Sequence, residues 1–397
     1  MSRRTASFNA RIVYTGVALA SGGIAFYVPL LLAVVGLAHS GAWAAGIVCG
    51  TNLGRVAGSH FASRVEAFTR RRGLIVANIL LEGVALFSMA FLQDAWMLLV
   101  AATVAGLGSG LSFPGMKNAL LRLDGLEPAR AFAGLSVSFR VGNLAGYIAG
   151  AMVGPGHLVA VFGVLLAMFV GYAACMRVVL RDLDAVDAGR APALAPAAAR
   201  DESAAPAADA SSGLPLLLGA NALFWFLSIQ PTVAMSLHVP RFVPGLPVAT
   251  PYWVITATIL LLQMPVTRRA RGPATHRAFL RTGSACMALG FAAMALAGAH
   301  AAAVVAAALL LGLSQVFFGP SLDVLVTGHA RAAGLDTGRV MARQMFWQNL
   351  GMTTGSLAAG LLFDLGLRVG WPGLVWSVAA VGAAGLLVAF VARTSAR

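Results

Sequence analysis

The sequence predicts an all-α integral membrane protein with twelve transmembrane helices in two six-helix halves, and three observations lead to this prediction. Of the 397 residues, 59% are hydrophobic and only 11% are charged, whereas ordinary soluble domains carry about 25% charged residues. Apolar runs of about 20 residues, the length that crosses a bilayer, recur along the chain. Basic residues collect in alternate loops between these runs, which is the positive-inside pattern of membrane proteins.

The apolar runs define two sets of six expected spans. The first set lies near 12–36, 41–62, 73–93, 95–118, 131–154 and 156–179. The second set lies near 213–236, 247–267, 278–298, 300–325, 340–365 and 371–392. The basic N-terminus raises the alternative of a signal peptide, but the first run is longer than a signal core. We therefore expect an uncleaved first span.

The basic residues orient this arrangement. With the N-terminus in the cytoplasm, 24 of the 28 Lys and Arg residues fall on the cytoplasmic side. Only Arg241 and Arg368 fall on the opposite side, and Arg55 and Arg140 lie inside spans. One missed helix would invert the side of every later loop, so this asymmetry supports twelve spans with both termini in the cytoplasm.

Two similar stretches and one polar segment divide the chain. At a fixed offset of 206 positions, Pro114 falls on Pro320 and Asn143 on Asn349, which indicates two copies of one bundle. Residues 181–212 are rich in Ala, Pro and Asp and have no apolar period. They are typical of a flexible linker, although an Ala-rich helix over part of the segment is an alternative. We expect bundles at 1–180 and 213–397 with a cytoplasmic linker at 181–212.

Several function classes are disfavoured. The net charge of +14 would suggest nucleic acid for a soluble protein, but these charges lie in short loops between apolar runs. Cys49, Cys175 and Cys286 all lie in apolar segments, without a disulfide framework or metal-ligand spacing. The sequence has no P-loop and no nucleophile–base arrangement. We therefore expect no nucleic-acid partner, no cofactor or metal, no enzymatic activity and no ATP-driven pumping.

Glycines recur every four positions in two of the expected spans. Gly50, Gly54 and Gly58 lie in the second span, and Gly142, Gly146 and Gly150 lie in the fifth. Such ridges of small residues let two helix backbones approach closely. The pattern therefore predicts close helix pairs at both places.

The chain resembles the major facilitator superfamily of transporters. GLGSGLSFPGMKNALL in the fourth span and EPARAFAGLSVSFRVGNLAGYIAG at the fifth resemble bacterial drug-exporter members, and DTGRVMARQMFWQNLGMTTGSLAAGLL in the second half is similar. The loop after the second span resembles the family pattern G-x-L-A-D-R-x-G-R-R. It keeps Gly58, Arg64, Arg70, Arg71 and Arg72, while Ser63 stands at the acidic position. In the fifth span, Tyr147 replaces the proline of the antiporter signature G-x-x-x-G-P.

The resemblance implies a monomeric, multi-pass transporter of the bacterial inner membrane that works by alternating access. We expect it to export a small organic molecule, such as a drug-like compound or a secreted metabolite like a siderophore, in exchange for protons. Import of an organic anion or sugar is the alternative on the same fold. A membrane receptor or a membrane-embedded enzyme would be a different class, and the internal repeat favours transport over both.

Glu82 and Arg55 are the first pair of candidate functional residues, because ionisable groups at bilayer depth are costly. Counted from the cytoplasmic ends of their spans, Arg55 lies about seven residues in and Glu82 about nine, so at about 1.5 Å per residue their depths agree within a few Å. One interpretation is a structural ion pair between spans two and three. The other is that Glu82 binds and releases a proton beside Arg55.

Arg140 lies at the centre of the fifth span, without an acidic residue at its depth. Its planar guanidinium suits a carboxylate or phosphate of a substrate, or it braces neighbouring helices. Asn143 lies one turn away on the same face. Gln348 and Asn349 are the equivalents in the second half by the repeat. Together these residues predict a polar belt where the two halves meet.

Lys117 and Asp323 occupy matching positions in the two halves, 206 residues apart. They carry opposite charge near the cytoplasmic ends of spans four and ten. We expect them to form a gate pair that is made when the transporter faces outward and broken when it faces inward. The alternative is that each is solvated at a helix end.

Overall fold

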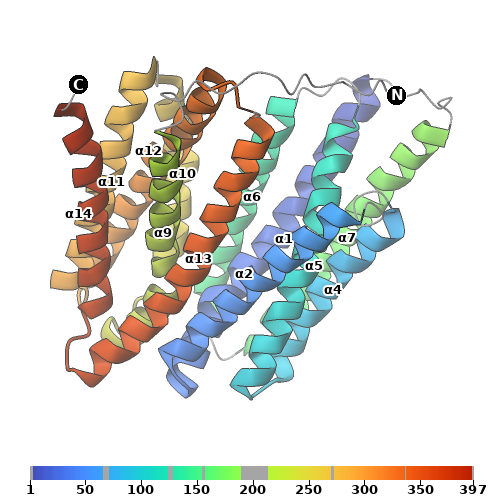
Figure 1. The fold of residues 1–397 in the computed structure, drawn as a ribbon. Coiled ribbons are helices and arrows are strands. Elements are labelled where there is room, and N and C mark those ends of the chain that lie inside the picture. Colours follow the sequence, from blue (N-terminus) through green and yellow to red (C-terminus); the bar gives the residue numbers. More distant parts are fainter. Residues whose placement is uncertain are drawn as a thin grey trace. The chain divides into compact units, whose positions relative to one another are not determined.

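A computed structural model describes residues 3–65, 71–123, 128–153, 157–188, 213–269, 272–335 and 337–395. In these ranges the regular structure consists of twelve α-helices and one short 3₁₀ turn, η1 (Met89–Phe91). The contacts divide the chain into two compact units (Figure 1). Unit 1 holds Met1–His39 and Gly46–Ala197, and unit 2 holds Ser40–Ala45 and Ala198–Arg397.

Each unit is a bundle of long helices. The helices that begin before the linker are α1 (Arg3–Ala38), α2 (Gly41–Arg64), α4 (Arg72–Ser88), α5 (Ala95–Leu121), α6 (Pro128–Val153) and α7 (Leu158–Ala188). Those that follow it are α9 (Leu214–Phe242), α10 (Thr250–Arg269), α11 (Gly272–Ala297), α12 (Ala301–Ala332), α13 (Thr337–Arg368) and α14 (Leu374–Ser395). Every expected span therefore coincides with one helix, and the all-α prediction is confirmed.

Nine of the described helices are long and apolar enough to cross a membrane, so the chain is a multi-pass membrane protein. The helices α2, α6 and α10 are not among the nine. Glycine, serine and arginine in α2 and α6, and threonine, proline and arginine in α10, lower their mean hydropathy. Twelve spans, and the side on which each terminus lies, remain predictions.

Helix α7 continues beyond the expected start of the linker at residue 181 and ends at Ala188. Two contacts hold this extension on unit 1. Asn9 Nδ2 of α1 donates a hydrogen bond to Asp182 over 3.2 Å, and Arg72 at the start of α4 lies 3.7 Å from the Asp184 carboxylate. The first turns of the expected linker are thus helical, and residues 189–212 lie outside the described residues.

Close helix pairs form where the glycine ridges predicted them. On α6, a Cβ at Gly142 or Gly146 would collide with the carbonyl oxygens of Ala18 or Gly22 on α1. On α2, a Cβ at Gly54 would collide with the carbonyl of Thr103 on α5. These backbones can approach so closely only because no side chain intervenes, and the prediction is confirmed.

Unit 2 repeats this packing scheme. Gly351 on α13 faces the carbonyl of Ala222 on α9, as Gly146 on α6 faces α1. A Cβ at Gly312 on α12 would lie 2.8 Å from Thr258 Cβ on α10. Gly312 stands 206 positions after Gly106 (312 − 106), which faces α2 from α5. The offset of 206 therefore recurs in the helix contacts of Gly106 and Gly312, while Gly146 and Gly351 are 205 positions apart (351 − 146).

Candidate functional site

Glu82 lies on the face of α4 that points into unit 1, and its side chain is only 6% exposed. Helix α5 passes directly beside it. A Cβ at Gly108 would lie 2.9 Å from the backbone nitrogen of Glu82 and 2.8 Å from the carbonyl oxygen of Asn78. The next residue, Ser109, donates a side-chain hydrogen bond to the Glu82 carboxylate. Because Gly108 has no side chain, α5 can approach α4 closely, and this approach puts the Ser109 hydroxyl within reach of the Glu82 carboxylate.

Arg55 reaches the same place from α2. Its backbone carbonyl packs against Gly110 of α5, and Ser59 Oγ on the next turn donates to the Gly110 carbonyl over 3.4 Å. Arg55 and Glu82 interact electrostatically. Their side chains do not form an ion pair within 4.0 Å in the part of the chain that the structure describes. The structure therefore brings the two predicted residues into one cluster without a direct salt bridge.

Two tyrosines complete this group. Tyr27 of α1 and Tyr172 of α7 are each 5% exposed, and each interacts electrostatically with Glu82. The Tyr27 ring also packs against Phe162, with 5.1 Å between the ring centroids. We call Glu82, Arg55, Ser109, Tyr27 and Tyr172 the Glu82 cluster. It draws one residue from each of five helices, and the sequence associated only Arg55 with Glu82.

Two buried asparagines adjoin the Glu82 cluster. Asn78 precedes Glu82 by one turn of α4, and Asn52 precedes Arg55 by one turn of α2, so each shares a helix face with the charged residue. Both are 8% exposed. Their side-chain nitrogens are buried and have no hydrogen-bond partner among the described residues. A buried hydrogen-bond donor without an acceptor destabilises the fold by about 1–3 kcal/mol. These two side chains are therefore candidates for binding water or another polar partner.

Arg140 is partly buried on α6, and it interacts electrostatically with Tyr147 two turns along the same helix. Asn143 lies between them and is also partly buried. Sequence analysis noted Tyr147 only as a substitution of the antiporter proline. Arg140 and Tyr147 are seven residues apart, a spacing that places two side chains on the same face of a helix. This spacing could have indicated their interaction from the sequence.

In unit 2, the polar residues centre on Gln344. Its Nε2 donates to Asp323 Oδ1 of α12 over 2.6 Å, and its backbone carbonyl accepts a hydrogen bond from Asn221 Nδ2 of α9 at 3.0 Å. Gln344 is 4% exposed. The predicted Gln348 and Asn349 lie about one turn further along α13 and are partly buried. Gln344 thus adds a polar residue one turn before Gln348 and Asn349, whose role remains a prediction.

The remaining predicted residues have local partners. Lys117 Nζ lies 4.6 Å from the centroid of the Phe113 ring, one turn earlier on α5, which is a cation–π contact. The partner of Asp323 inside unit 2 is Gln344. Lys117 and Asp323 belong to different units, and their pairing remains a prediction.

The loop between α2 and α4 is described only in part. Gly58 packs against Leu107 and Gly110 of α5. Arg71 is exposed just before α4, and Arg72 pairs with Asp184 of α7. Arg70 and the side chains of Ser63 and Arg64 lie outside the described residues. The family-like pattern of this loop therefore remains a prediction at those positions.

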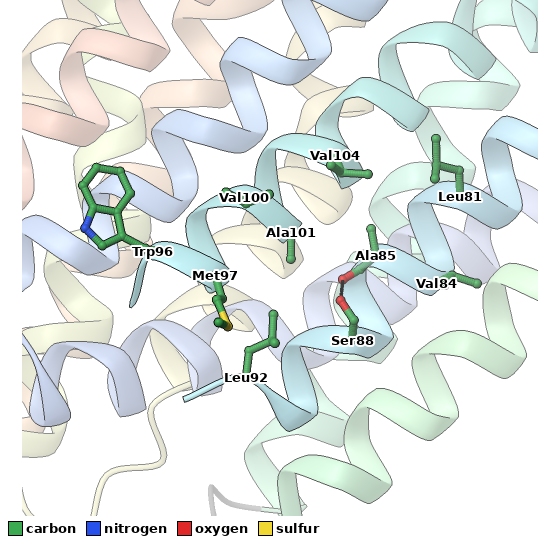
Figure 2. Close-up of a pocket in the computed structure, with 10 residues that line it drawn as sticks. All are labelled: Leu81, Val84, Ala85, Ser88, Leu92, Trp96, Met97, Val100, Ala101 and Val104. Atoms are coloured by element: carbon green, nitrogen blue, oxygen red, sulfur yellow. Dashed lines mark hydrogen bonds between the residues drawn. The ribbon is translucent and has the colours of Figure 1, made fainter. Parts of the chain in front are cut away.

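A groove of 520 Å³ runs along α4 and α5 on unit 1 (Figure 2). Trp96 and Met97 lie at one end of it, and Leu81 lies at the other. Ser88 contributes a hydroxyl group to the lining of the groove, and this hydroxyl donates a hydrogen bond to the carbonyl of Ala85 over 2.7 Å. Trp96 is 68% exposed and Leu81 39%. These properties suit contact with lipid chains better than binding of a charged solute.

Within the described ranges, no group of three or more His, Cys, Asp or Glu side chains is placed to hold a metal ion. Cys49, Cys175 and Cys286 are free thiols. The polar groups of the two units are instead carboxylates, guanidinium groups, amides and phenols. Such groups bind protons and polar organic molecules through hydrogen bonds and charge.

Comparisons with known proteins relate this fold to transporters. No family model and no curated protein matches the sequence. Among solved structures, the nucleoside transporter NupG is 13% identical, with a TM-score of 0.72, over 97% of this chain and 98% of that chain. A POT family transporter in complex with a thioalcohol-conjugated peptide is 12% identical, with a TM-score of 0.74, over 97% and 96% of the two chains.

The human organic anion transporter MFSD10 (TETRAN) is 17% identical, with a TM-score of 0.62, over 98% of this chain and 100% of that chain. All three matches extend over nearly the whole length of both proteins. The chain thus shares its fold with these three transporters, in agreement with the fold that the sequence resemblance implied.

Proposed function

We propose that this protein is a secondary active transporter that exports a small organic molecule by alternating access, in exchange for protons. The observation that carries the proposal is the Glu82 cluster, in which a buried carboxylate interacts electrostatically with the half-buried Arg55 among the helices of unit 1. Ionisable residues at this depth are expensive and mark substrate or ion pathways. In unit 2, the buried Gln344 donates a hydrogen bond to Asp323 and supplies a second polar contact between helices.

The substrate class follows from the charges that lie within the helices. Arg55 and Arg140 outnumber Glu82 in unit 1, which favours an organic molecule with an anionic group. Arg140 is the residue proposed to bind that group, because its planar fork pairs with carboxylates and phosphates. Asn143, Gln348 and Asn349 would donate hydrogen bonds to other polar atoms of the substrate.

Import of an organic anion or sugar is the second candidate. The similar structures are named as transporters of nucleosides, peptides and organic anions, and the same buried residues serve either direction. In alternating access, the gradients of the substrate and the coupling ion set the direction of transport, so the same residues can serve export or import. We propose that the protein is a monomer in a bacterial inner membrane.

The direction is tested by accumulation of labelled candidate compounds in cells that express the wild type or Arg140→Ala, with and without a proton uncoupler. Export predicts low accumulation in the wild type that rises with the substitution and with the uncoupler. Arg368→Ala is the matched control, because Arg368 is exposed at the end of α13. High accumulation in the wild type that collapses under the uncoupler would replace export by import.

A further inference from the structure

The Glu82 cluster and the two asparagines beside it form one polar region of buried and half-buried residues. The segment of α5 from Gly106 to Gly110 passes between α2 and α4. Gly106 faces the carbonyl of Thr51, which adjoins Asn52, whereas Gly108 faces the carbonyl of Asn78. Asn52 and Asn78 therefore flank the same short piece of α5 that carries Ser109 to Glu82.

Charged and titratable groups from three other helices act on Glu82. Arg55 of α2, Tyr27 of α1 and Tyr172 of α7 interact electrostatically with Glu82, and Cys175 interacts with Tyr172. Helix α5 contributes the hydroxyl of Ser109, which does not titrate. The nitrogens of the Arg55 guanidinium do not lie within 4.0 Å of the Glu82 carboxylate oxygens, so Glu82 has no direct salt bridge to Arg55.

Two amide donors in this region have no protein partner. The side-chain nitrogens of Asn52 and Asn78 are buried and unpaired among the described residues. Buried polar groups that lack a protein partner are usually satisfied by ordered water, which bridges two to four such groups. Water held at these two amides would lie on the helix faces of α2 and α4 that also carry Arg55 and Glu82.

We propose that Glu82 is the proton-binding site of unit 1 and that Asn52 and Asn78 hold the water molecules through which protons reach it. An excess proton that enters these waters as hydronium passes to a carboxylate oxygen of Glu82, which becomes the neutral acid and leaves the waters neutral. Its release returns the proton to water and restores the carboxylate, which accepts the Ser109 hydrogen bond. This inference rests on the proposed function, in which the bound proton is the coupling ion.

Infrared difference spectroscopy on the purified protein in lipid vesicles tests this site without a substrate. A protonated carboxylic acid absorbs in a carbonyl-stretch region that ionised carboxylates leave empty. The wild type is expected to gain such a band as the pH falls, and Glu82→Gln is expected to lose it. Asp94→Asn is the control and keeps the band, because Asp94 is an exposed residue before α5.

Glu82→Asp is the second variant, in case Glu82→Gln does not fold. It retains a carboxyl group, so we expect its acid band to persist at a shifted frequency. Asn52→Leu together with Asn78→Leu is expected to slow the deuterium shift of the band in heavy water. Identical acid bands in the wild type and Glu82→Gln would overturn the proton site. Unchanged exchange in the double variant would overturn the water route. If the rate of transport is the same with and without a proton uncoupler, proton coupling is rejected, and this result does not depend on the infrared band of Glu82.

Discussion

The carboxylate of Asp364 on α13 accepts hydrogen bonds from the backbone N–H groups of Gly41 and Ala42, the first residues of α2. The N···O distances are 2.8 Å for Gly41 and 2.9 Å for Ala42. The first turn of a helix has unpaired N–H groups and a partial positive charge, which a carboxylate satisfies best. A Cβ at Gly41 would lie 3.0 Å from the carbonyl of Gly360, so this approach also requires glycine. The first turn of α2 is thereby anchored on α13, and Ser40–Ala45 group with unit 2.

Replacement of Asp364 by Asn should destabilise this anchor. An uncharged amide keeps one acceptor oxygen, so the variant loses one hydrogen bond and the interaction with the helix dipole. We expect a loss of about 1–2 kcal/mol, measured as a lower melting temperature of the purified protein. Asp94→Asn is the control, because Asp94 precedes α5 without a side-chain capping bond. Equal losses in both variants would show that the contact contributes nothing specific.

Gly146→Ala should destabilise the pair formed by α1 and α6. The added methyl group would collide with the carbonyl of Gly22, and overpacking of this kind typically costs about 1–3 kcal/mol. The matched variant is Gly163→Ala on α7, where nothing lies within 4 Å of the added Cβ. That change should be neutral or stabilise by up to about 1 kcal/mol. The two melting temperatures should therefore move in opposite directions or differ clearly, and similar shifts would argue against close backbone contact at Gly146.

Trp376→Phe should destabilise unit 2. Trp376 Nε1 donates to His238 Nδ1 over 3.3 Å, and His238 Nε2 lies 3.0 Å from the carbonyl oxygen of Gly298. Because the indole N–H only donates, Nδ1 is the acceptor and His238 is the neutral Nε2–H tautomer. Loss of the donor leaves a buried acceptor unpaired, which costs about 1–3 kcal/mol. Thermal unfolding measures the loss against Trp371→Phe at an exposed position, and no difference between the two would contradict the hydrogen bond.

Charge reversal tests the proposed gate of Lys117 and Asp323. Lys117→Asp and Asp323→Lys each place like charges in the pair, and each should reduce efflux about tenfold, equivalent to about 1.4 kcal/mol. The double reversal restores opposite charges and should recover most of the transport rate. Efflux of a compound identified in the accumulation assay is the measurement. If the double variant is as inactive as either single variant, the two residues do not form a gate.

The sequence predicted the helices and their close contacts well, because both depend on local patterns. Runs of apolar residues located every helix, and glycines at intervals of four located the contacts of α2 and α6. Equal depth in adjacent spans was enough to associate Arg55 with Glu82. The sequence left open whether part of 181–212 is helical, and the contacts of the α7 extension to Ala188 come from Asn9 and Arg72, which are distant in sequence.

The rest of the candidate site depends on tertiary packing that one sequence does not reveal. Tyr27 and Tyr172 lie in α1 and α7, and only the folded bundle turns both toward Glu82. The contact of Gln344 with Asp323 joins two helices whose rotation about their axes was unknown. Asp364 is separated from Gly41 by 323 positions, and nothing in either local segment indicates the other.

The central claim, alternating access, is tested most directly by spin-label distances between the two units measured at two pH values. One label pair replaces Arg122 and Gly328 near the predicted cytoplasmic ends of α5 and α12, and the other replaces Asp94 and His300 near the opposite ends of these helices. The account predicts two populations for each pair, with the cytoplasmic distance growing as the other shrinks when the pH changes. Single distances that stay the same at both pH values, in both pairs, would contradict it.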